Sequence, residues 1–186
     1  FSAKLTAVDG KRVDKTEIGT KEEAAELLAR LREAQFNVTK VRKRITKKHP
    51  AAPFITSTLQ QDASYRLGFQ SKRTMKVAQE LYEGIDLGSE FGGVQGLITY
   101  MRTDSLRVSA SSQEAALALI GELYGEKYVP ATPRVYKSKA DAQDAHEAIR
   151  PASVSIQPKQ IRKLLTSDQY RLYKLIWERF IASQME

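Results

Sequence analysis

Polar and apolar residues alternate along the first seven positions of the chain, and this period of two predicts a β-strand. Asp9-Gly10 follows, a dipeptide that favours the tight two-residue turn between antiparallel strands, and Lys11-Arg12-Val13 comes after it. We therefore expect the chain to open with a β-hairpin.

The period then changes to that of a helix. Thr20-Lys21-Glu22-Glu23 has the form of a capping box. Apolar residues recur after it at helical spacing, namely Ala24, Leu27, Leu28 and Leu31. The pattern predicts a helix to about Ala34 with one buried stripe.

Residues 38–48 alternate again, but here the polar positions are basic. Lys40, Arg42, Arg44 and Lys48 would share one face of a strand, with Val41 and Ile45 on the other. Such a basic strand fits a surface that faces phosphates in a DNA cavity. It fits equally well a solvated edge strand whose lysines prevent aggregation.

From residue 53 onward the helical period dominates. Ser57-Thr58-Leu59-Gln60 is a second capping box, opening a helix that ends near Gly68, and another helix should follow within a few residues. Further helices are expected at 113–124, at 140–149 before Pro151, from Pro158, and from a cap at Ser167-Asp168. In the last of these the stripe of Tyr173, Ile176, Trp177 and Phe180 is typical of a core, so we assign it no ligand. The predicted fold class is α+β.

Composition narrows the possible partners. Thirty basic and 22 acidic residues give the 186-residue chain a net charge of +8, which favours a polyanion, and nucleic acid before membrane because no long apolar run occurs. With no cysteine, the sequence has no disulfide and no thiolate metal site, which fits a reducing compartment. The chain lacks an initiating Met and its last helical pattern is still running at Glu186, so we expect a piece of a larger protein.

The densest candidate chemistry lies at Tyr100, near the end of a short apolar segment, 97–101, that predicts a strand. Arg102, Thr103, Asp104 and Ser105 follow it directly. A protonated phenol attacks a phosphodiester poorly unless its proton is removed or its developing charge is stabilised. A forked guanidinium such as that of Arg102 can bind the phosphate and stabilise the negative charge that develops on it. The alternative is a surface tyrosine followed by a capped turn.

Two other features concern nucleic acid. On the helix predicted at 140–149, His146 and Arg150 are four residues apart, so a phosphate could sit between them; a surface histidine paired with a local carboxylate is the alternative. The two short helices joined by residues 67–71, with Lys72 and Arg73 opening the second, also fit a helix-turn-helix. A DNA-binding module without catalysis is therefore an alternative function.

Four stretches resemble the type IA DNA topoisomerases, specifically bacterial DNA topoisomerase I. They are 53–61 (PFITSTLQQ), 96–105 (GLITYMRTDS), 144–151 (DAHEAIRP) and 175–185 with Leu175-Ile176-Trp177, Phe180 and Gln184-Met185. The resemblance implies relaxation of negatively supercoiled DNA through transient single-strand cleavage, a 5′-phosphotyrosine on Tyr100, strand passage and religation, with Arg102 beside the phosphate. The DNA-binding residues implied or suggested are Thr103, Asp104, Ser105, His146, Arg150, Arg42 and Arg44.

The resemblance also implies an organisation. Residues 1–59 would be part of a strand-rich arch domain, with one hairpin, one helix and one basic strand, and residues 60–186 an all-helical domain carrying Tyr100. Family members bind Mg²⁺ through an Asp-x-Asp-x-Glu cluster on another domain. No such cluster occurs in this sequence, so we assign no metal ligand. Asp141 and Asp144 are three residues apart and belong to a different motif. No Walker loop is present and no ATP is expected.

The expected partners are single-stranded and negatively supercoiled DNA and the missing metal-binding and remaining arch domains of the same polypeptide. No membrane partner is expected. The expected location is the cytoplasm, at the bacterial nucleoid. The fragment alone should be inactive. A tyrosine recombinase or a nicking enzyme is a further alternative, but the Tyr100 signature argues against both, and two histidines, His49 and His146, are too few for a nicking enzyme's histidine metal cluster.

Overall fold

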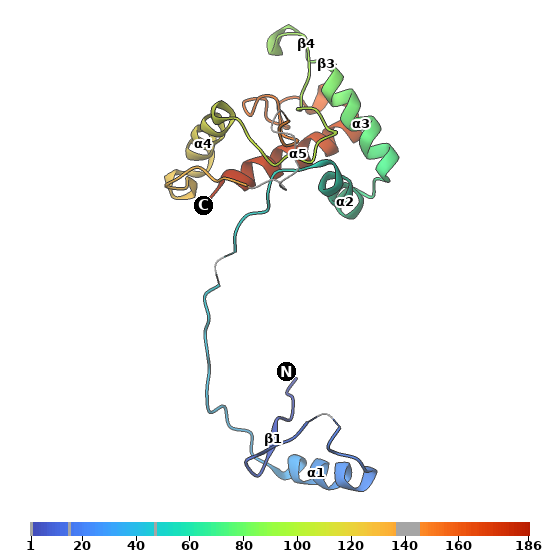
Figure 1. Ribbon diagram of the computed structural model, residues 1–186, viewed down its shortest axis with the longest axis vertical. Helices are drawn as coiled ribbons and strands as arrows, with labels where there is room; N and C mark the ends of the chain where they lie inside the picture. The colour runs from blue at the N-terminus through green and yellow to red at the C-terminus, as the bar shows by residue number, and fades with distance from the viewer. Residues whose placement is uncertain (1, 15, 47, 137–145) are drawn as a thin grey trace. The chain divides into compact units, whose positions relative to one another are not determined.

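A computed structural model describes residues 2–14, 16–46, 48–136 and 146–186 (Figure 1). The chain divides into two compact units, Phe1–Thr46 and Lys47–Glu186. Each is described by itself.

The first unit opens with the predicted hairpin. Strands β1 (Ala7–Val8) and β2 (Lys11–Arg12) pair antiparallel, with Ala7 opposite Arg12. Asp9 and Gly10 both have positive φ, 50° and 79°, as a type I′ turn requires. The strands are shorter than the alternating pattern predicted.

Helix α1 (Lys21–Glu33) has the predicted capping box between Thr20 and Glu23. Its apolar stripe, however, is not buried: Leu28 is 54% and Leu31 38% exposed. The prediction of a buried stripe was wrong because a two-residue hairpin offers too little apolar surface to cover a helix within this unit.

The predicted basic strand at 38–48 is also wrong. In the described part of this segment the chain forms no strand, and Val38, Val41 and Ile45 are 83%, 73% and 94% exposed. A strand needs a hydrogen-bonded neighbour, and the strand pairs among the described residues do not include this segment.

The second unit packs its helices around α5 (Ser167–Gln184), which runs through its centre in Figure 1. Helices α2 (Thr56–Leu67) and α3 (Ser71–Glu83) contact α5 on one side, and α4 (Ala110–Tyr124) contacts it on the other. The described residues of this unit also form three short 3₁₀ turns: η1 (Ser89–Phe91), η2 (Glu126–Tyr128) and η3 (Arg162–Leu164).

This unit is not all-helical. Strands β3 (Ile85–Asp86) and β4 (Val94–Gln95) form a small antiparallel pair within the stretch that we predicted to be an all-helical domain. Helices and small antiparallel sheets together confirm the α+β class.

The predicted core stripe of α5 is confirmed. Tyr173, Ile176 and Phe180 are fully buried, and Trp177 is 6% exposed. The Trp177 indole donates to the Val154 carbonyl at 3.1 Å, and the Tyr173 hydroxyl donates to the Ile156 carbonyl at 2.7 Å. Burial raises the pKa of the Tyr173 phenol far above its usual range.

Several predicted element boundaries need correction. Helix α2 begins at Thr56, because the Thr58 hydroxyl accepts the Ile55 N–H and caps the helix earlier than Ser57. The last helix is capped by Thr166 and Gln169 rather than by Ser167-Asp168. The helix predicted from Pro158 is only a turn leading into η3.

The predicted domain boundary at 59/60 falls inside α2, while the two compact units divide between Thr46 and Lys47. The assignment of the first residues to an arch domain stays a prediction.

Candidate functional site

Three stretches singled out in the sequence lie side by side in the second unit. Phe54 forms an isolated antiparallel bridge with Ile149, and Ile98 forms another with Pro151. The strand predicted at 97–101 is reduced to this bridge. Residues 148–151 thus lie between the segments that carry Phe54 and Ile98, and these contacts hold the Tyr100 segment in place.

The bridges correct the helix predicted at 140–149. Residues 137–145 lie outside the described residues, and 146–150 are non-helical. Ile149 donates its N–H to the Phe54 carbonyl at 2.8 Å. The backbone groups of this stretch therefore bind neighbouring segments and do not form the hydrogen bonds of a helix. His146 and Arg150 therefore do not share a helix face.

The segment after Thr99 alternates between the interior and the solvent. Met101, Thr103 and Ser105 are buried, at 0%, 7% and 2% exposure, whereas Tyr100 is 41% exposed. Arg102 and Asp104 are exposed as well. Alternate residues of this segment thus direct the phenol, the guanidinium and the carboxylate outward.

Thr103 and Ser105 have a structural role in this arrangement. The Thr103 hydroxyl accepts the Ser105 N–H at 3.1 Å, and the Ser105 hydroxyl accepts the Arg107 N–H at 3.2 Å. These are the local side-chain-to-backbone bonds that fix a turn. Of the predicted contacts with DNA in this segment, Arg102 and Asp104 are the exposed ones.

Thr56, the first residue of α2, fixes the backbone on either side of Arg102. Its hydroxyl donates to the Met101 carbonyl at 2.8 Å and accepts the Thr103 N–H at 2.9 Å. Its own N–H donates to the Thr103 carbonyl at 2.9 Å.

Thr99 fixes the other end of the segment. Its hydroxyl donates to the Ala148 carbonyl at 2.7 Å and accepts the Arg150 N–H at 3.0 Å, and its N–H donates to the Arg150 carbonyl at 2.9 Å. Tyr100 therefore follows a residue whose backbone and side chain are both held.

Arg150 is buried, with 9% exposure. Its guanidinium donates to the Glu147 carboxylate, at 3.1 Å from Nε, and to the Pro151 carbonyl at 2.9 Å. The sequence predicted this arginine as a phosphate ligand; the structure places it inside the framework behind Thr99.

An open cavity of about 520 Å³ is lined by exposed polar side chains from all three stretches. It is lined by the start of α2, by residues 102–104 and by His146, whose side chain comes from the third segment; the lining residues are Ile55, Thr56, Ser57, Arg102, Thr103, Asp104 and His146. Arg102, Asp104 and His146 are thus brought together, at the positive end of a helix dipole. Tyr100 is exposed two residues before Arg102 in the chain, but its side chain does not line this cavity.

Glycine permits a close approach just before the segment. A Cβ on Gly96 would lie 2.6 Å from the Tyr82 carbonyl oxygen at the end of α3. The backbone passes close enough for the Leu97 N–H to donate to the Leu81 carbonyl at 2.7 Å. Any larger residue at 96 would move the start of the segment.

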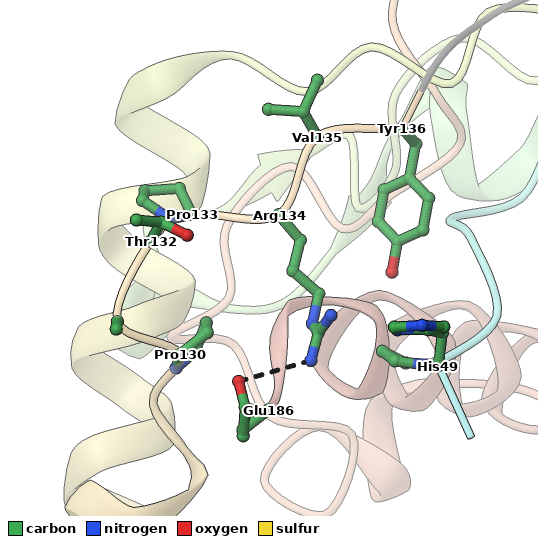
Figure 2. A pocket seen from close by; sticks show the side chains of 10 residues that line it. His49, Pro130, Thr132, Pro133, Arg134, Val135, Tyr136 and Glu186 are labelled. Carbon is green, nitrogen blue, oxygen red and sulfur yellow. Dashed lines mark ion pairs between the residues drawn. The ribbon is translucent and has the colours of Figure 1, made fainter. Parts of the chain in front are cut away.

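A second cavity, of about 440 Å³, lies near the end of α5 (Figure 2). Three of its polar side chains are bound within the fold. Arg134 pairs with Glu186 at 3.5 Å and donates to the Met185 carbonyl, and the Tyr136 hydroxyl donates to the Ser183 carbonyl at 2.7 Å. Burial raises the pKa of the Tyr136 phenol, opposed by the charges of Arg134 and Arg179. His49 lines this cavity and His146 the other, so the two histidines line separate cavities.

The remaining predicted contacts lie in the first unit. Arg42 and Arg44 are exposed on a segment without secondary structure. Within the residues that the structure describes, no group of three or more His, Cys, Asp or Glu side chains could hold a metal ion. Nor does any helix there have the length and apolarity to cross a membrane.

Sequence reasoning missed Thr56, Thr99 and Glu147. Each lies in a stretch that carried the resemblance, but Thr56 and Thr99 bind segments that are 45 and 51 positions away. Glu147 pairs with the nearby Arg150, whose burial depends on the same packing between segments. Spacing along one segment cannot reveal such pairing.

The chain is similar to DNA topoisomerases in both sequence and structure. The sequence model of the DNA topoisomerase family matches residues 2–186. DNA topoisomerase 1 of Rickettsia bellii is 47% identical over 187 residues, covering 100% of this chain and 23% of the relative, and that of Rickettsia felis is 47% identical, covering 100% and 24%. The structure of full-length topoisomerase I from Thermotoga maritima matches with a TM-score of 0.73 and 41% identity, covering 97% of this chain and 27% of that one.

The chain therefore belongs to the DNA topoisomerase family, as a member of its bacterial type IA branch, and the predicted resemblance is confirmed. It spans about a quarter of the length of these curated relatives. Membership over residues 2–186 replaces the helix-turn-helix, recombinase and nicking-enzyme alternatives.

Proposed function

We propose that this chain supplies the nucleophile and part of the strand-binding surface of a type IA DNA topoisomerase, an isomerase that relaxes negatively supercoiled DNA without ATP. The phenol oxygen of Tyr100 attacks a backbone phosphorus, a new O–P bond forms, and the bond to the 3′ oxygen breaks. The phenol proton leaves to a base and the 3′ oxygen takes up a proton. Because one phosphodiester replaces another, the reversal needs no external energy source.

The observation that carries this proposal is the convergence of Arg102, Asp104 and His146 on one cavity, with the exposed Tyr100 two residues before Arg102 in the chain. A guanidinium two residues from the phenol can stabilise the charge that grows on the phosphate oxygens. An imidazole can hold or exchange a proton near neutral pH. The first turn of α2 adds the positive end of a helix dipole, which favours an anion.

Arg150 receives a different role from the one its motif suggested. Its guanidinium is enclosed by Glu147 and the Pro151 carbonyl, and its backbone holds Thr99. This burial supports positioning of the Tyr100 segment rather than direct contact with the strand.

Mg²⁺ belongs to the complete enzyme in this proposal, where it would offset phosphate charge during transfer to and from the 3′ oxygen. We assign it no ligand here. This chain alone would then bind single-stranded DNA but not cleave it at a useful rate, and it would act with the metal-binding and remaining arch domains of its own polypeptide, in the cytoplasm at the nucleoid.

The test uses the full-length protein that contains this sequence, incubated with Mg²⁺ and a labelled single-stranded oligonucleotide and then denatured. We expect a 5′-phosphotyrosine on the peptide containing Tyr100, and none in Tyr100→Phe. Tyr65→Phe is the matched control, since Tyr65 is 89% exposed and lies on α2 outside the cavity lining. An adduct on another tyrosine, or a Tyr100→Phe variant that still forms one, would contradict the proposal.

A further inference from the structure

Tyr100 contacts a second tyrosine that the mechanism above does not use. The rings of Tyr82 and Tyr100 lie edge to face, with centroids 5.3 Å apart and planes at 65°. Both side chains are partly exposed, at 40% and 41%. An edge-to-face pair has a preferred geometry because the positive ring edge of one meets the negative face of the other.

The backbones on both sides of this contact are fixed to each other. Leu97, three residues before Tyr100, donates its N–H to the Leu81 carbonyl, and Gly96 lies against the Tyr82 carbonyl itself. Tyr82 sits in the last turn of α3, whose inward residues Ala78 and Leu81 are fully buried. The second ring is therefore carried by a rigid element that is anchored beside the segment it contacts.

From this geometry we propose that Tyr82 is a positioning residue for the nucleophile. A half-exposed phenol can rotate about its Cα–Cβ bond, and each rotamer that leaves the attack geometry lowers the rate. The Tyr82 ring favours one rotamer of Tyr100. The inference rests on the proposed function, since it requires Tyr100 to be the nucleophile.

The contact has a kinetic signature that ordinary packing lacks. The same ring orients the free phenol during cleavage and the phosphotyrosine during religation. Loss of the ring therefore slows both steps by a similar factor and leaves the equilibrium fraction of cleaved strand unchanged. A residue that instead bound DNA would change the affinity for the oligonucleotide.

The experiment compares variants of the full-length protein in single-turnover cleavage at saturating oligonucleotide and in religation after the covalent complex has been isolated. Tyr82→Leu and Tyr82→Met, which remove the ring but keep apolar bulk, should slow both steps roughly three- to tenfold. Tyr82→Phe keeps the ring and should restore rates near those of the wild type. Oligonucleotide affinity and the thermal unfolding midpoint should stay unchanged, and the use of two ring-removing variants guards against the misfolding of one.

The chain provides a matched control pair. Tyr124 and Tyr128 also lie edge to face, at 6.4 Å and 72°, with similar exposures of 46% and 41%, and neither lines the cavity that Arg102 lines. Tyr128→Leu should leave both rates unchanged.

The possible outcomes distinguish the positioning role of Tyr82 from the proposed role of Tyr100 as the nucleophile. Wild-type rates in both Tyr82→Leu and Tyr82→Met, or a loss confined to DNA affinity, would overturn the positioning role while leaving Tyr100 as the nucleophile. Absence of any Tyr100 adduct in the wild type would overturn both.

Discussion

Thr56 shows how much a single hydroxyl can determine. It joins the start of α2 to Met101 and Thr103 through a donated and an accepted hydrogen bond, and both of these residues are buried. A buried backbone group that loses its partner costs about 1–3 kcal/mol, since water does not replace it.

We therefore predict that Thr56→Val lowers the free energy of unfolding of this chain by about 1–3 kcal/mol, measured by urea denaturation followed through Trp177 fluorescence. Thr56→Ser keeps the hydroxyl and should cost less than Thr56→Val. Equal losses in the two variants would contradict this, because they would show that the methyl group contributes as much as the hydrogen bonds.

Tyr173 gives a prediction about alkaline stability. Burial raises the pKa of its phenol, so above pH about 10 the unfolded chain releases a proton that the folded chain retains. The stabilisation is complete below the unfolded pKa and is lost as the pH rises above it.

The unfolding free energy should thus fall as the pH rises above about 10, and it should fall less steeply in Tyr173→Phe. Part of the slope should remain, because burial also raises the pKa of Tyr136. Urea titrations of the two proteins at several pH values measure this difference, and parallel slopes would contradict the assignment to Tyr173.

At the scale of elements, Arg179 connects α5 to the stretch that supports the site. Its guanidinium pairs with Asp62 of α2, donates to the Ala52 carbonyl at 3.3 Å and lies 4.4 Å from the Phe54 ring centroid. Phe54 in turn bridges Ile149. A side chain on the central helix thereby fixes the position of the segments around Tyr100.

Arg179→Met should destabilise the chain by roughly 1–3 kcal/mol, because Asp62 and the Ala52 carbonyl lose a partly buried partner. The matched control is Lys174→Met on the same helix, which breaks only the exposed Lys174–Glu178 pair and should change stability by less than about 0.5 kcal/mol. Urea denaturation of both variants provides the comparison. A similar loss in both would mean that the two ion pairs contribute alike.

The elements that the sequence predicted well are those governed by local rules. Asp9-Gly10 can adopt the positive φ angles of a hairpin turn by itself, and the Thr20–Glu23 capping box needs only one turn of helix. The strand predicted at 38–48 and the described part of the helix predicted at 140–149 were wrong for a different reason. A β-strand requires a neighbouring strand, and the segment 38–48 has none among the described strand pairs. The backbone groups of residues 148–150 form hydrogen bonds with distant segments instead of the bonds that a helix would require.

At the scale of the whole molecule, the same distinction applies to the candidate site. The motif segments identified Arg102, Asp104 and His146, which the structure brings to one cavity. The buried position of Arg150 and the contact between Tyr82 and Tyr100 depend on how separate segments pack, so no pattern within one segment could predict them.

The basic segment of the first unit supplies a prediction for DNA binding by the entire chain. No acidic residue occurs from 34 to 61, and Lys40, Arg42, Lys43 and Arg44 are all exposed. Each phosphate contact with single-stranded nucleic acid releases counterions and contributes about 0.7 to the slope of log K against log salt concentration. If Arg42 and Arg44 contact phosphates, the double substitution Arg42→Gln/Arg44→Gln should lower that slope by about 1.4 in binding of labelled oligo(dT).

The control for this prediction removes the same charge elsewhere in the unit. Arg12→Gln/Arg32→Gln also replaces two exposed arginines, but at β2 and at the end of α1. A general effect of net charge would change the slope equally in the two double variants. A larger decrease for the Arg42→Gln/Arg44→Gln variant would show that this segment contacts the DNA directly, although its described residues form no β-strand.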